Sequence, residues 1–496
     1  MTQEFNQMLD VRMAQFEKYL DRTNMAHNKY QHDGVRWILM NELKKNPVCK
    51  VRGGFIADEM GLGKTILMIG TLLCNFQQNS LIIVPPVLID QWYDQIHRTT
   101  GHKPLIYHGE GKKTITVEQL RKTPIVITTY GAITLTKKQI LNNDVTVLHQ
   151  MNWGRIVYDE AHHLRNHRTT RYTSAKMLSA KICWLVSGTP VQNRKQDFYS
   201  LCDIIKIPSS FYSGSANLGL LASSFILKRT KLQAGIQMTN VVSNTNMVSW
   251  QNRKEMHLSE EIHSALAFSN VSSSKGGMLC DILMSSTEQS VLPIMLRARQ
   301  SCIYPKLIAN HLEHLVKTGV ISDYLKYKEG INHSSKLDYV VNTILEHKGN
   351  GCGKLIFCHF REEIDEIATR LRAGGMTAVA TFDGRTVSSK RADILNRKNE
   401  ALILQIQTGC EGLNLQENYS EIYFISPHWN PAVEDQAVAR CHRIGQTKAV
   451  YVRRFEMCNF VDGEKEIEMQ TRTIDNYVMS IQDSKRSIAN ECIEVE

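Results

Sequence analysis

Short apolar runs alternate with stretches of helical periodicity along two long parts of the chain. In the first part, we predict strands at residues 54–57, 81–84, 125–128, 155–158 and 183–186. In the second part, we predict strands at residues 354–359, 377–381, 401–405 and 421–425. Two parallel strands must be joined by a crossover of about a dozen residues or more, which is usually a helix. Strands that alternate with helices are therefore expected to run parallel. The pattern therefore predicts an α/β protein with two doubly wound parallel-sheet lobes.

Other segments flank or separate these lobes. Residues 3–21 carry apolar side chains at helical spacing and predict an amphipathic helix that packs on the first lobe. From about residue 197 to 335 the alternation weakens, and we expect a mostly helical insertion there. The expected parts are an N-terminal helix (1–29), a first lobe (30–235), a helical insertion and linker (236–335), a second lobe (336–485) and an acidic tail (486–496).

A glycine-rich turn, Ala-Asp-Glu-Met-Gly-Leu-Gly-Lys-Thr at residues 57–65, follows the first predicted strand. Such a turn lets backbone N–H groups close around phosphate, places the Lys64 ammonium on the terminal phosphates and offers the Thr65 hydroxyl to Mg²⁺. The apolar run 66–73 predicts a helix whose positive end faces that phosphate. The general pattern has Gly where this chain has Asp58, and a lone Gly-Lys-Thr can also be a simple helix start.

Two carboxylates, Asp159 and Glu160, directly follow the apolar run 153–158. Carboxylates at the end of a buried strand suit a site for a metal ion and water. We expect Asp159 to hold Mg²⁺ through water and Glu160 to polarise the attacking water. The alternative is that both residues cap a helix that begins at Ala161. The wider series favours an ATPase, because Gln31 precedes the turn and Gln436, Arg440 and Arg443 follow far downstream.

The formal net charge of +10 is unevenly distributed. Residues 461–496 hold nine acidic and four basic side chains, so residues 1–460 carry +15. This excess predicts a polyanionic partner for the body of the protein.

The twelve cysteines include no Cys-x-x-Cys pair, so we expect reduced core residues and no zinc module. The chain shows no signal peptide, and no uninterrupted apolar stretch approaches membrane-spanning length. We therefore expect a soluble intracellular protein without a membrane partner.

Taken together, the motifs resemble the Swi/Snf-type DNA translocases of helicase superfamily 2. The resemblance rests on residues 30–37, 57–65, 83–86, 127–130, 159–162, 187–193, 357–360, 412–415 and 436–446. It covers about residues 30 to 485, and Asp58 is usual in that family. Residues 155–158 and 429–435 look most like the subgroup of DNA-damage-tolerance and transcription-termination translocases. Members of this subgroup often carry a RING finger, which this chain does not show, so ubiquitin-ligase activity is not carried over.

The resemblance implies two RecA-like lobes and assigns roles to residues. ATP contacts would come from Gln31, Asp58, Glu59, Met60, Gly61, Leu62, Gly63, Lys64, Thr65, Asp159 and Gln436. Thr65 and Asp159 would contact Mg²⁺, and Gln31 would read the adenine edge. Lys64 and Glu160 would act in catalysis with Arg440 and Arg443, which lie three apart on a presumed helix and would reach the γ-phosphate.

Further residues are expected to connect ATP with DNA. Ser187 and Thr189 would couple the nucleotide state to the grip on DNA. The candidate contacts to the DNA backbone are residues 127–130, 165–171 and 228–231 with Lys390, Arg391, Arg397 and Lys398.

The resemblance implies an ATP-dependent translocase on double-stranded DNA that remodels or displaces DNA-bound proteins in chromatin remodelling, DNA repair or transcription. The expected partners are duplex DNA, nucleosomes or polymerases, and a targeting protein. Its expected location is the nucleus or the DNA-containing compartment of a virus-infected cell. The alternatives are a strand-separating DNA or RNA helicase and an ATP-switched DNA-binding scaffold.

Overall fold

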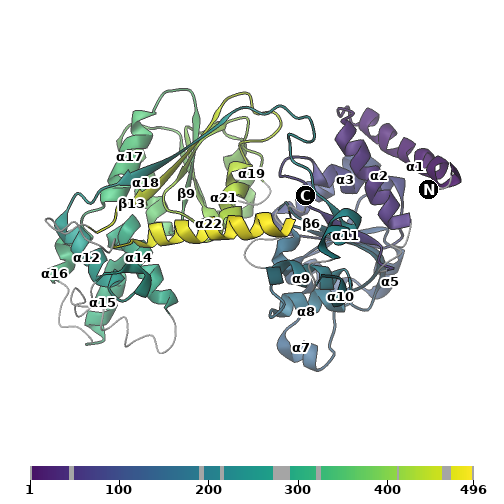
Figure 1. Ribbon diagram of the computed structural model, residues 1–496, viewed down its shortest axis with the longest axis horizontal. Helices are drawn as coiled ribbons and strands as arrows, with labels where there is room; N and C mark the ends of the chain where they lie inside the picture. Colours follow the sequence, from purple (N-terminus) through teal and green to yellow (C-terminus); the bar gives the residue numbers. More distant parts are fainter. Residues whose placement is uncertain are drawn as a thin grey trace. The chain divides into compact units, whose positions relative to one another are not determined.

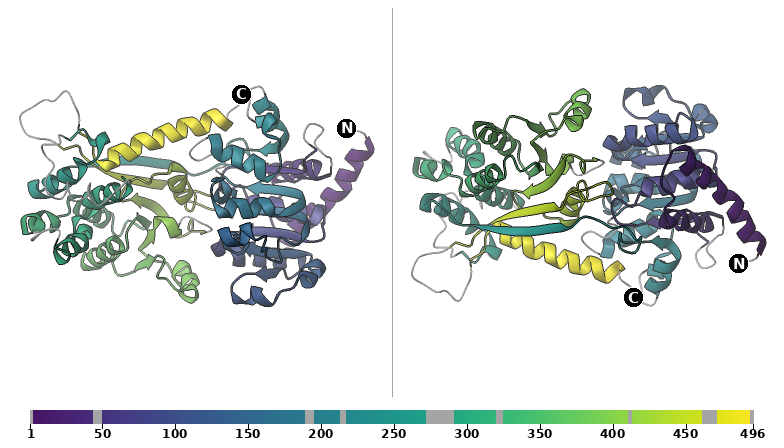
Figure 2. Two further views of the ribbon diagram at one scale, coloured as in Figure 1. Left: turned by 90° about the horizontal axis from the view of Figure 1, so that it is seen from below. Right: turned by 90° about the horizontal axis from the view of Figure 1, so that it is seen from above.

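The computed structural model describes residues 3–43, 50–188, 195–212, 217–271, 291–319, 325–409, 413–460 and 471–493. The chain divides into two compact units, the first formed by residues 1–237 with 485–496 and the second by residues 238–484. In Figure 1 the colours run from purple in the first unit to yellow at the last helix, and Figure 2 gives two further views.

The first unit is built on a seven-stranded sheet in the order β3-β4-β2-β5-β6-β1-β7, and all its neighbouring strands are parallel. The strands are β1 (Gly53–Ile56), β2 (Ser80–Val84), β3 (Leu105–Tyr107), β4 (Ile125–Thr129), β5 (Asn152–Asp159), β6 (Ser179–Val186) and β7 (Ile226–Leu227). The predicted parallel α/β lobe is confirmed. The sequence did not reveal β3 and β7, which are too short to form a clear apolar run.

Helices cover both faces of this sheet. They are α1 (Gln3–Arg22), α2 (Lys29–Leu43), α3 (Lys64–Cys74), α4 (Ile89–Thr100), α5 (Val117–Lys122), α6 (Tyr130–Ile133), α7 (Lys137–Leu141), α8 (Thr170–Met177), α9 (Lys195–Ile204), α10 (Ser209–Tyr212) and α11 (Leu218–Phe225). One core joins α1 to α4 with the sheet, and α8 to α11 belong to the core of the other face. Phe16 of α1 packs so closely on Gly70 of α3 that a Cβ there would lie 2.5 Å from its ring.

A fully buried ion pair joins four elements of the first unit. The Arg155 guanidinium on β5 donates to both carboxylate oxygens of Glu42 on α2, at 2.7 and 2.5 Å. Glu42 also accepts hydrogen bonds from Trp184 on β6 at 2.8 Å and from Asn75, directly after α3, at 2.7 Å. Since a buried charge is costly without partners, this network specifies how the four elements assemble.

The second unit has a six-stranded parallel sheet in the order β10-β11-β9-β12-β13-β8. The strands are β8 (Val241–Val248), β9 (Gly353–Cys358), β10 (Val379–Phe382), β11 (Ala401–Gln405), β12 (Tyr419–Phe424) and β13 (Val450–Met457). The sequence did not reveal β8 or β13. Most side chains of the edge strand β8 are exposed, so its sequence lacks the apolar residues of a buried face.

The helices of the second unit are α12 (Arg253–His263), α14 (Leu292–Ile303), α15 (Ala309–Lys317), α16 (Leu325–Ile331), α17 (Ser335–Glu346), α18 (Arg361–Ala373), α19 (Ser388–Asn396), α20 (Ile406–Gly409), α21 (Pro431–Val438) and α22 (Ile474–Ile493). Residues of α12, α14, α15 and α16 share one core with α17, α18 and one face of the sheet. These four helices, α12, α14, α15 and α16, therefore pack as part of this unit.

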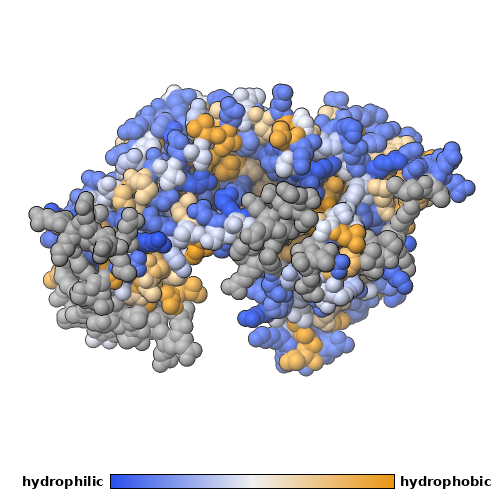
Figure 3. Space-filling view, in the orientation of Figure 1, coloured by the Kyte–Doolittle hydropathy of each residue, from blue (hydrophilic) through white to orange (hydrophobic). Residues whose placement is uncertain are grey.

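The visible face in Figure 3 is mainly hydrophilic, with small apolar patches. Large exposed apolar side chains such as Val11, Phe76, Leu141 and Leu232 come from different elements. Within the described ranges, none of the helices combines the length and apolar character that a membrane crossing requires.

Candidate active site

The glycine-rich turn, called the phosphate loop below (residues 57–65), connects β1 with α3. The helix begins at Lys64, two residues before the predicted start. Gly61 and Gly63 have φ values of 92° and 78°, which favour glycine because it lacks Cβ. The Lys64 ammonium donates to the carbonyl of Asp58 at 2.9 Å, so it lies within the curve of the loop. The N–H groups at the start of α3 and this ammonium form a site that suits phosphate.

The end of β6 closely approaches the phosphate loop. A Cβ on Gly188 would lie 2.9 Å from Met60 Cγ and 3.2 Å from Lys64 Nζ. Ser187, just before this glycine, has its Oγ 3.5 Å from His162 Nδ1. Ser187, one of the two residues expected to couple the nucleotide state to the grip on DNA, therefore lies near the phosphate loop. The other, Thr189, lies outside the described residues.

Asp159 ends β5 and is buried. Its Oδ2 accepts a hydrogen bond from the Trp92 indole at 2.7 Å, and its Oδ1 accepts one from the N–H of Glu160 at 3.0 Å. Burial, and then the neighbouring Glu160 charge, raise the pKa of the Asp159 carboxyl to about 6, while the Lys64 charge acts in the opposite direction. Since β5 and β1 both pair in parallel with β6, Asp159 and the phosphate loop lie at the same edge of the sheet.

The side chain of Glu160 does not cap the short helix that follows it at Ala161–Leu164. The helix-cap alternative therefore has no support in its hydrogen bonding. The backbone of Glu160 adopts a left-handed conformation, with φ 51° and ψ 50°, which is uncommon for a residue with a side chain. Its Oε2 lies 3.4 Å from His162 Nδ1. The Tyr130 hydroxyl donates to the Asp159 carbonyl at 2.7 Å and helps to fix this turn.

Gln31 on α2 packs against the phosphate loop. It is buried, and its Nε2 lies 2.9 Å from the place that a Cβ on Gly63 would take. The predicted base-reading residue is thus next to the predicted phosphate-binding residues. Thr65 follows Lys64 in the first turn of α3.

The Asp58 carboxylate is fully buried and engaged by Arg229. Arg229 Nε donates to Oδ1 at 3.1 Å and Nη2 donates to Oδ2 at 2.5 Å. Lys231 Nζ lies 3.3 Å from Glu59 Oε1. Both cations therefore pair with carboxylates of the phosphate loop, and their contact with DNA phosphate stays a prediction. Sequence reasoning missed this role, since 171 residues separate Arg229 from Asp58.

In the second unit, the chain around Arg440 departs from prediction. The helix α21 ends at Val438, so Arg440 and Arg443 do not lie on a helix. The helix stops because the following turn bonds to residues 414–416: the Arg440 carbonyl accepts from the N–H of Leu415 at 3.1 Å, and Arg443 donates to the Asn414 side chain.

Gln436 and Arg440 each have a buried nitrogen, Nε2 and Nε respectively, without a hydrogen-bond partner among the described residues. Burial, and then the Arg440 charge, lower the pKa of Arg443. Buried donors without partners and two neighbouring cations are expected where an anionic ligand completes a site.

The other candidate DNA contacts differ in accessibility. The side chains at 127–130 are buried in the first unit, so contact with DNA through them is not available. Arg165 and Arg168 line a hollow of about 770 Å³ that also holds Asp197. Among the cations of the second unit, Arg397 pairs with Asp393 at 2.7 Å, Arg391 lies over the Phe382 ring, and Lys390 and Lys398 are exposed.

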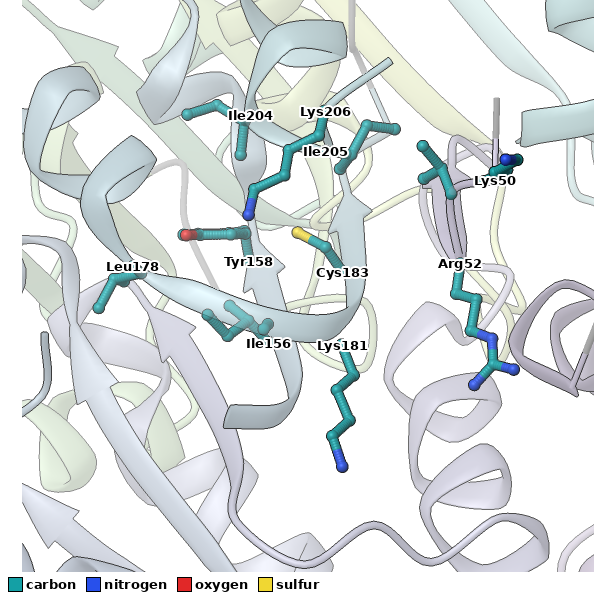
Figure 4. A pocket seen from close by; sticks show the side chains of 12 residues that line it. Lys50, Arg52, Ile156, Tyr158, Leu178, Lys181, Cys183, Ile204, Ile205 and Lys206 are labelled. Atoms are coloured by element: carbon teal, nitrogen blue, oxygen red, sulfur yellow. The ribbon is translucent and has the colours of Figure 1, made fainter. Parts of the chain in front are cut away.

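A separate cavity of about 260 Å³ lies near the starts of β1 and β6, whereas the phosphate loop follows the end of β1. Figure 4 shows Lys206 extending toward Tyr158 and Cys183, with Arg52 and Lys181 pointing away. The lining of this cavity includes none of the residues that are predicted to contact ATP.

Comparison with known protein families shows to which family the chain belongs. The SNF2-related domain matches residues 30–307, and the helicase conserved C-terminal domain matches residues 335–445. The chain belongs to the SNF2-related family. This is the family that the sequence motifs resemble, so the resemblance is confirmed. ATP use is characteristic of the relatives named as ATP-dependent helicases.

Several curated proteins are similar to this SNF2-related chain. An uncharacterized ATP-dependent helicase of Mycoplasma genitalium is 27% identical and covers 97% of this chain and 43% of its own. The probable global transactivator of Orgyia pseudotsugata multicapsid polyhedrosis virus is 25% identical over 96% of this chain and 92% of its own. DNA repair protein RAD5B of Arabidopsis thaliana is 24% identical over 85% and 45%.

This SNF2-related chain spans less than half the length of the two Mycoplasma helicases that it matches. Among solved structures, the Sulfolobus solfataricus SWI2/SNF2 ATPase core in complex with dsDNA is 21% identical, with a TM-score of 0.39, and the match covers 94% of this chain and 93% of that chain.

The site residues fit Mg²⁺ bound together with a nucleotide. In the described part of the chain, no group of three or more His, Cys, Asp or Glu side chains could hold a metal ion. Mg²⁺ commonly takes only one or two protein ligands and completes its shell with phosphates and water. Thr65 and Asp159 can supply such a small set of oxygen ligands, and a cation there would offset the cost of the buried Asp159 charge.

Proposed function

We propose that the chain is a DNA-dependent ATPase that translocates along double-stranded DNA and remodels or displaces DNA-bound proteins. The observation that carries this proposal is that the phosphate loop follows β1 and Asp159 ends β5, and both strands pair in parallel with β6, so the two groups lie at one edge of the sheet. Membership of the SNF2-related family supports the choice of DNA as the substrate.

The proposed roles follow from the chemistry of each group. Lys64 and the start of α3 bind the terminal phosphates of ATP. Thr65 and Asp159 hold Mg²⁺, which neutralises charge on those phosphates. Glu160 orients the attacking water and accepts its proton. Arg440 and Arg443 stabilise the charge that develops on the γ-phosphate.

ATP hydrolysis by the purified protein tests the proposal. We would compare rates without nucleic acid and with duplex DNA, single-stranded DNA or RNA, and use Lys64→Ala as the blank. Strong stimulation by duplex DNA is expected. Preference for RNA or single strands would instead favour a strand-separating helicase.

Glu160→Gln separates the enzyme from an ATP-switched scaffold. The amide keeps the size of the side chain but cannot accept the proton, so ATP should still bind while turnover falls by roughly 10²-fold to 10⁴-fold. Binding is measured by equilibrium titration and turnover by phosphate release. A scaffold would show no turnover to lose.

Binding to the DNA backbone also predicts a characteristic dependence on salt. Affinity for duplex DNA should show little sequence preference and fall by roughly 10³-fold or more between 50 and 200 mM salt. Displacement of a labelled protein from duplex DNA would then test the biological use. We propose nucleosomes or polymerases as the displaced proteins, a protein partner for targeting, and the nucleus or a viral DNA compartment as the location.

A further inference from the structure

The guanidinium of Arg229 contacts both segments of the proposed nucleotide site. Two of its nitrogens bind the Asp58 carboxylate of the phosphate loop, at 3.1 and 2.5 Å. Its third nitrogen, Nη1, donates to the carbonyl of Tyr30, the residue before Gln31. Arginine is suited to this arrangement because its planar group presents donors in fixed directions, whereas the lysine ammonium is a point charge.

The backbone around Arg229 follows the phosphate loop. The parallel pairing of β7 with β1 continues beyond both strands, because Ala57 donates to the Leu227 carbonyl at 2.8 Å and Glu59 donates to the Arg229 carbonyl at 2.9 Å. Lys231 N–H donates to Glu59 Oε2 at 2.8 Å. Hydrogen bonds to the segment 227–231 therefore hold the start of the phosphate loop in place.

The helix α2 is shaped to receive the same guanidinium. The Arg229 guanidinium lies 5.6 Å from the centre of the Tyr30 ring. A Cβ on Gly34 would lie 2.8 Å from Nη2, so a side chain at this turn of α2 would have to displace the guanidinium from its present position. The guanidinium thus fits between α2 and Asp58 and is only slightly exposed.

We propose that Arg229 is a positioning residue that connects base recognition with phosphate binding. By holding Tyr30 and Asp58 together, it fixes the place of Gln31 relative to Gly63 and Lys64. The inference rests on the proposed function, which assigns ATP to this site. Without Arg229, a nucleotide would bind chiefly through its phosphates, and selection of adenine over guanine would weaken.

Equilibrium binding of ATP, GTP and inorganic tripolyphosphate, each with Mg²⁺, tests this connection. The variants are Arg229→Lys, which keeps the charge but loses the fork, and Asp58→Asn, which keeps the shape. Arg36→Lys is the matched control, because Arg36 on α2 forms an ion pair with Asp10 at the surface. Circular dichroism and thermal unfolding check that each variant folds.

We expect Arg229→Lys to weaken ATP binding about tenfold, on the scale of one or two lost charge-assisted hydrogen bonds. GTP and tripolyphosphate binding should weaken much less, so the preference for ATP over GTP falls. Asp58→Asn should have the same direction of effect, and the double variant should be little worse than either single variant because both remove one connection. Arg36→Lys should leave the preference unchanged.

Equal losses for ATP, GTP and tripolyphosphate would overturn the inference and leave Arg229 as a support of the loop alone. Unchanged ATP binding in Arg229→Lys would also overturn it. Because these measurements need neither DNA nor turnover, they are separate from the proposed function. A wild-type protein that binds ATP selectively but is not stimulated by DNA would refute the proposed function and leave this inference standing.

Discussion

Burial and the Glu160 charge raise the pKa of the Asp159 carboxyl to about 6. Because this folded-state pKa is above the ordinary value of 3.8, ionisation of Asp159 makes the metal-free fold less stable as the pH rises from about 4 to 6. A bound cation favours the ionised form and reverses that loss. Asp159 therefore favours Mg²⁺ binding most when the pH is above the pKa of its carboxyl, because the carboxyl is then ionised.

We accordingly expect Mg²⁺ to raise the melting temperature more at pH 7.5 than at pH 5.0, since the carboxylate is largely protonated at the lower pH. Thermal unfolding with and without Mg²⁺ measures the difference. In Asp159→Asn the dependence on pH should largely disappear. An equal shift at both pH values, retained in the variant, would show that Mg²⁺ binds elsewhere.

Most residues of the candidate site could be found from local sequence, because the phosphate loop and the carboxylate pair are short motifs beside recognisable strands. Arg229 could not. A buried carboxylate such as Asp58 requires a partner, but the sequence does not say which of many cations supplies it when 171 residues lie between them.

At the scale of elements, the junction of the phosphate loop with α3 depends on Gly63. Alanine there would have to adopt a φ of 78°, and its Cβ would lie 2.9 Å from Gln31 Nε2. We expect Gly63→Ala to lower the stability by about 1–2 kcal/mol and to weaken ATP binding. Chemical denaturation and nucleotide titration measure the two effects.

Gly101 after α4 offers the control, because its φ is 71° and, apart from Gly101 and its two chain neighbours, no described residue has an atom within 4 Å of the place that a Cβ would take. Gly101→Ala should show a comparable conformational cost with normal ATP binding. If Gly63→Ala bound ATP normally, close packing of Gln31 on the loop would not matter for the site.

The ion pair of Glu42 and Arg155 connects α2 and β5, which carry Gln31 and Asp159. We expect Glu42→Ala to reduce the free energy of unfolding by about 3–5 kcal/mol, since it leaves the Arg155 charge buried without its partner. Asp10→Ala breaks the exposed pair with Arg36 and should cost about 1 kcal/mol or less. Urea unfolding compares them, and similar costs would contradict this view.

Element prediction succeeded where apolar runs are buried and failed where tertiary contacts decide. In the second sheet the sequence revealed β9 to β12, but neither the internal strand β13 nor the edge strand β8, whose side chains are mostly exposed. It also placed Arg440 on a helix, whereas the chain leaves α21 after Val438 to bond with residues 414–416. No local pattern reports that contact.

At the scale of the whole molecule, the proposed catalytic residues come from both units. The alternating pattern was sufficient to predict two parallel-sheet lobes, and the division into parts at 235 and 335 stays a prediction. Under the proposed function, turnover therefore depends on residues of both units, whereas ATP binding is assigned mainly to residues of the first unit.

Arg440→Ala and Arg443→Ala should therefore retain ATP binding while turnover with duplex DNA falls by about 10³-fold or more. Single-turnover hydrolysis and nucleotide titration separate the two steps. Arg397→Ala removes an exposed ion pair with Asp393 in the same unit and should leave the chemical step unchanged. Normal single-turnover rates in both Arg440→Ala and Arg443→Ala would refute their assigned role.

The pairing of β8 with β13 has a consequence for synthesis on the ribosome. The sheet of the first unit is complete in sequence once Leu227 has been made. In the second unit, Val241 of β8 pairs with Val450 of β13, so the edge strand must wait for more than 200 further residues. At about 5–20 residues per second this is a delay of tens of seconds at the slower rate. During that interval β8 lacks its neighbouring strand, whereas all strands of the first unit's sheet have already been made.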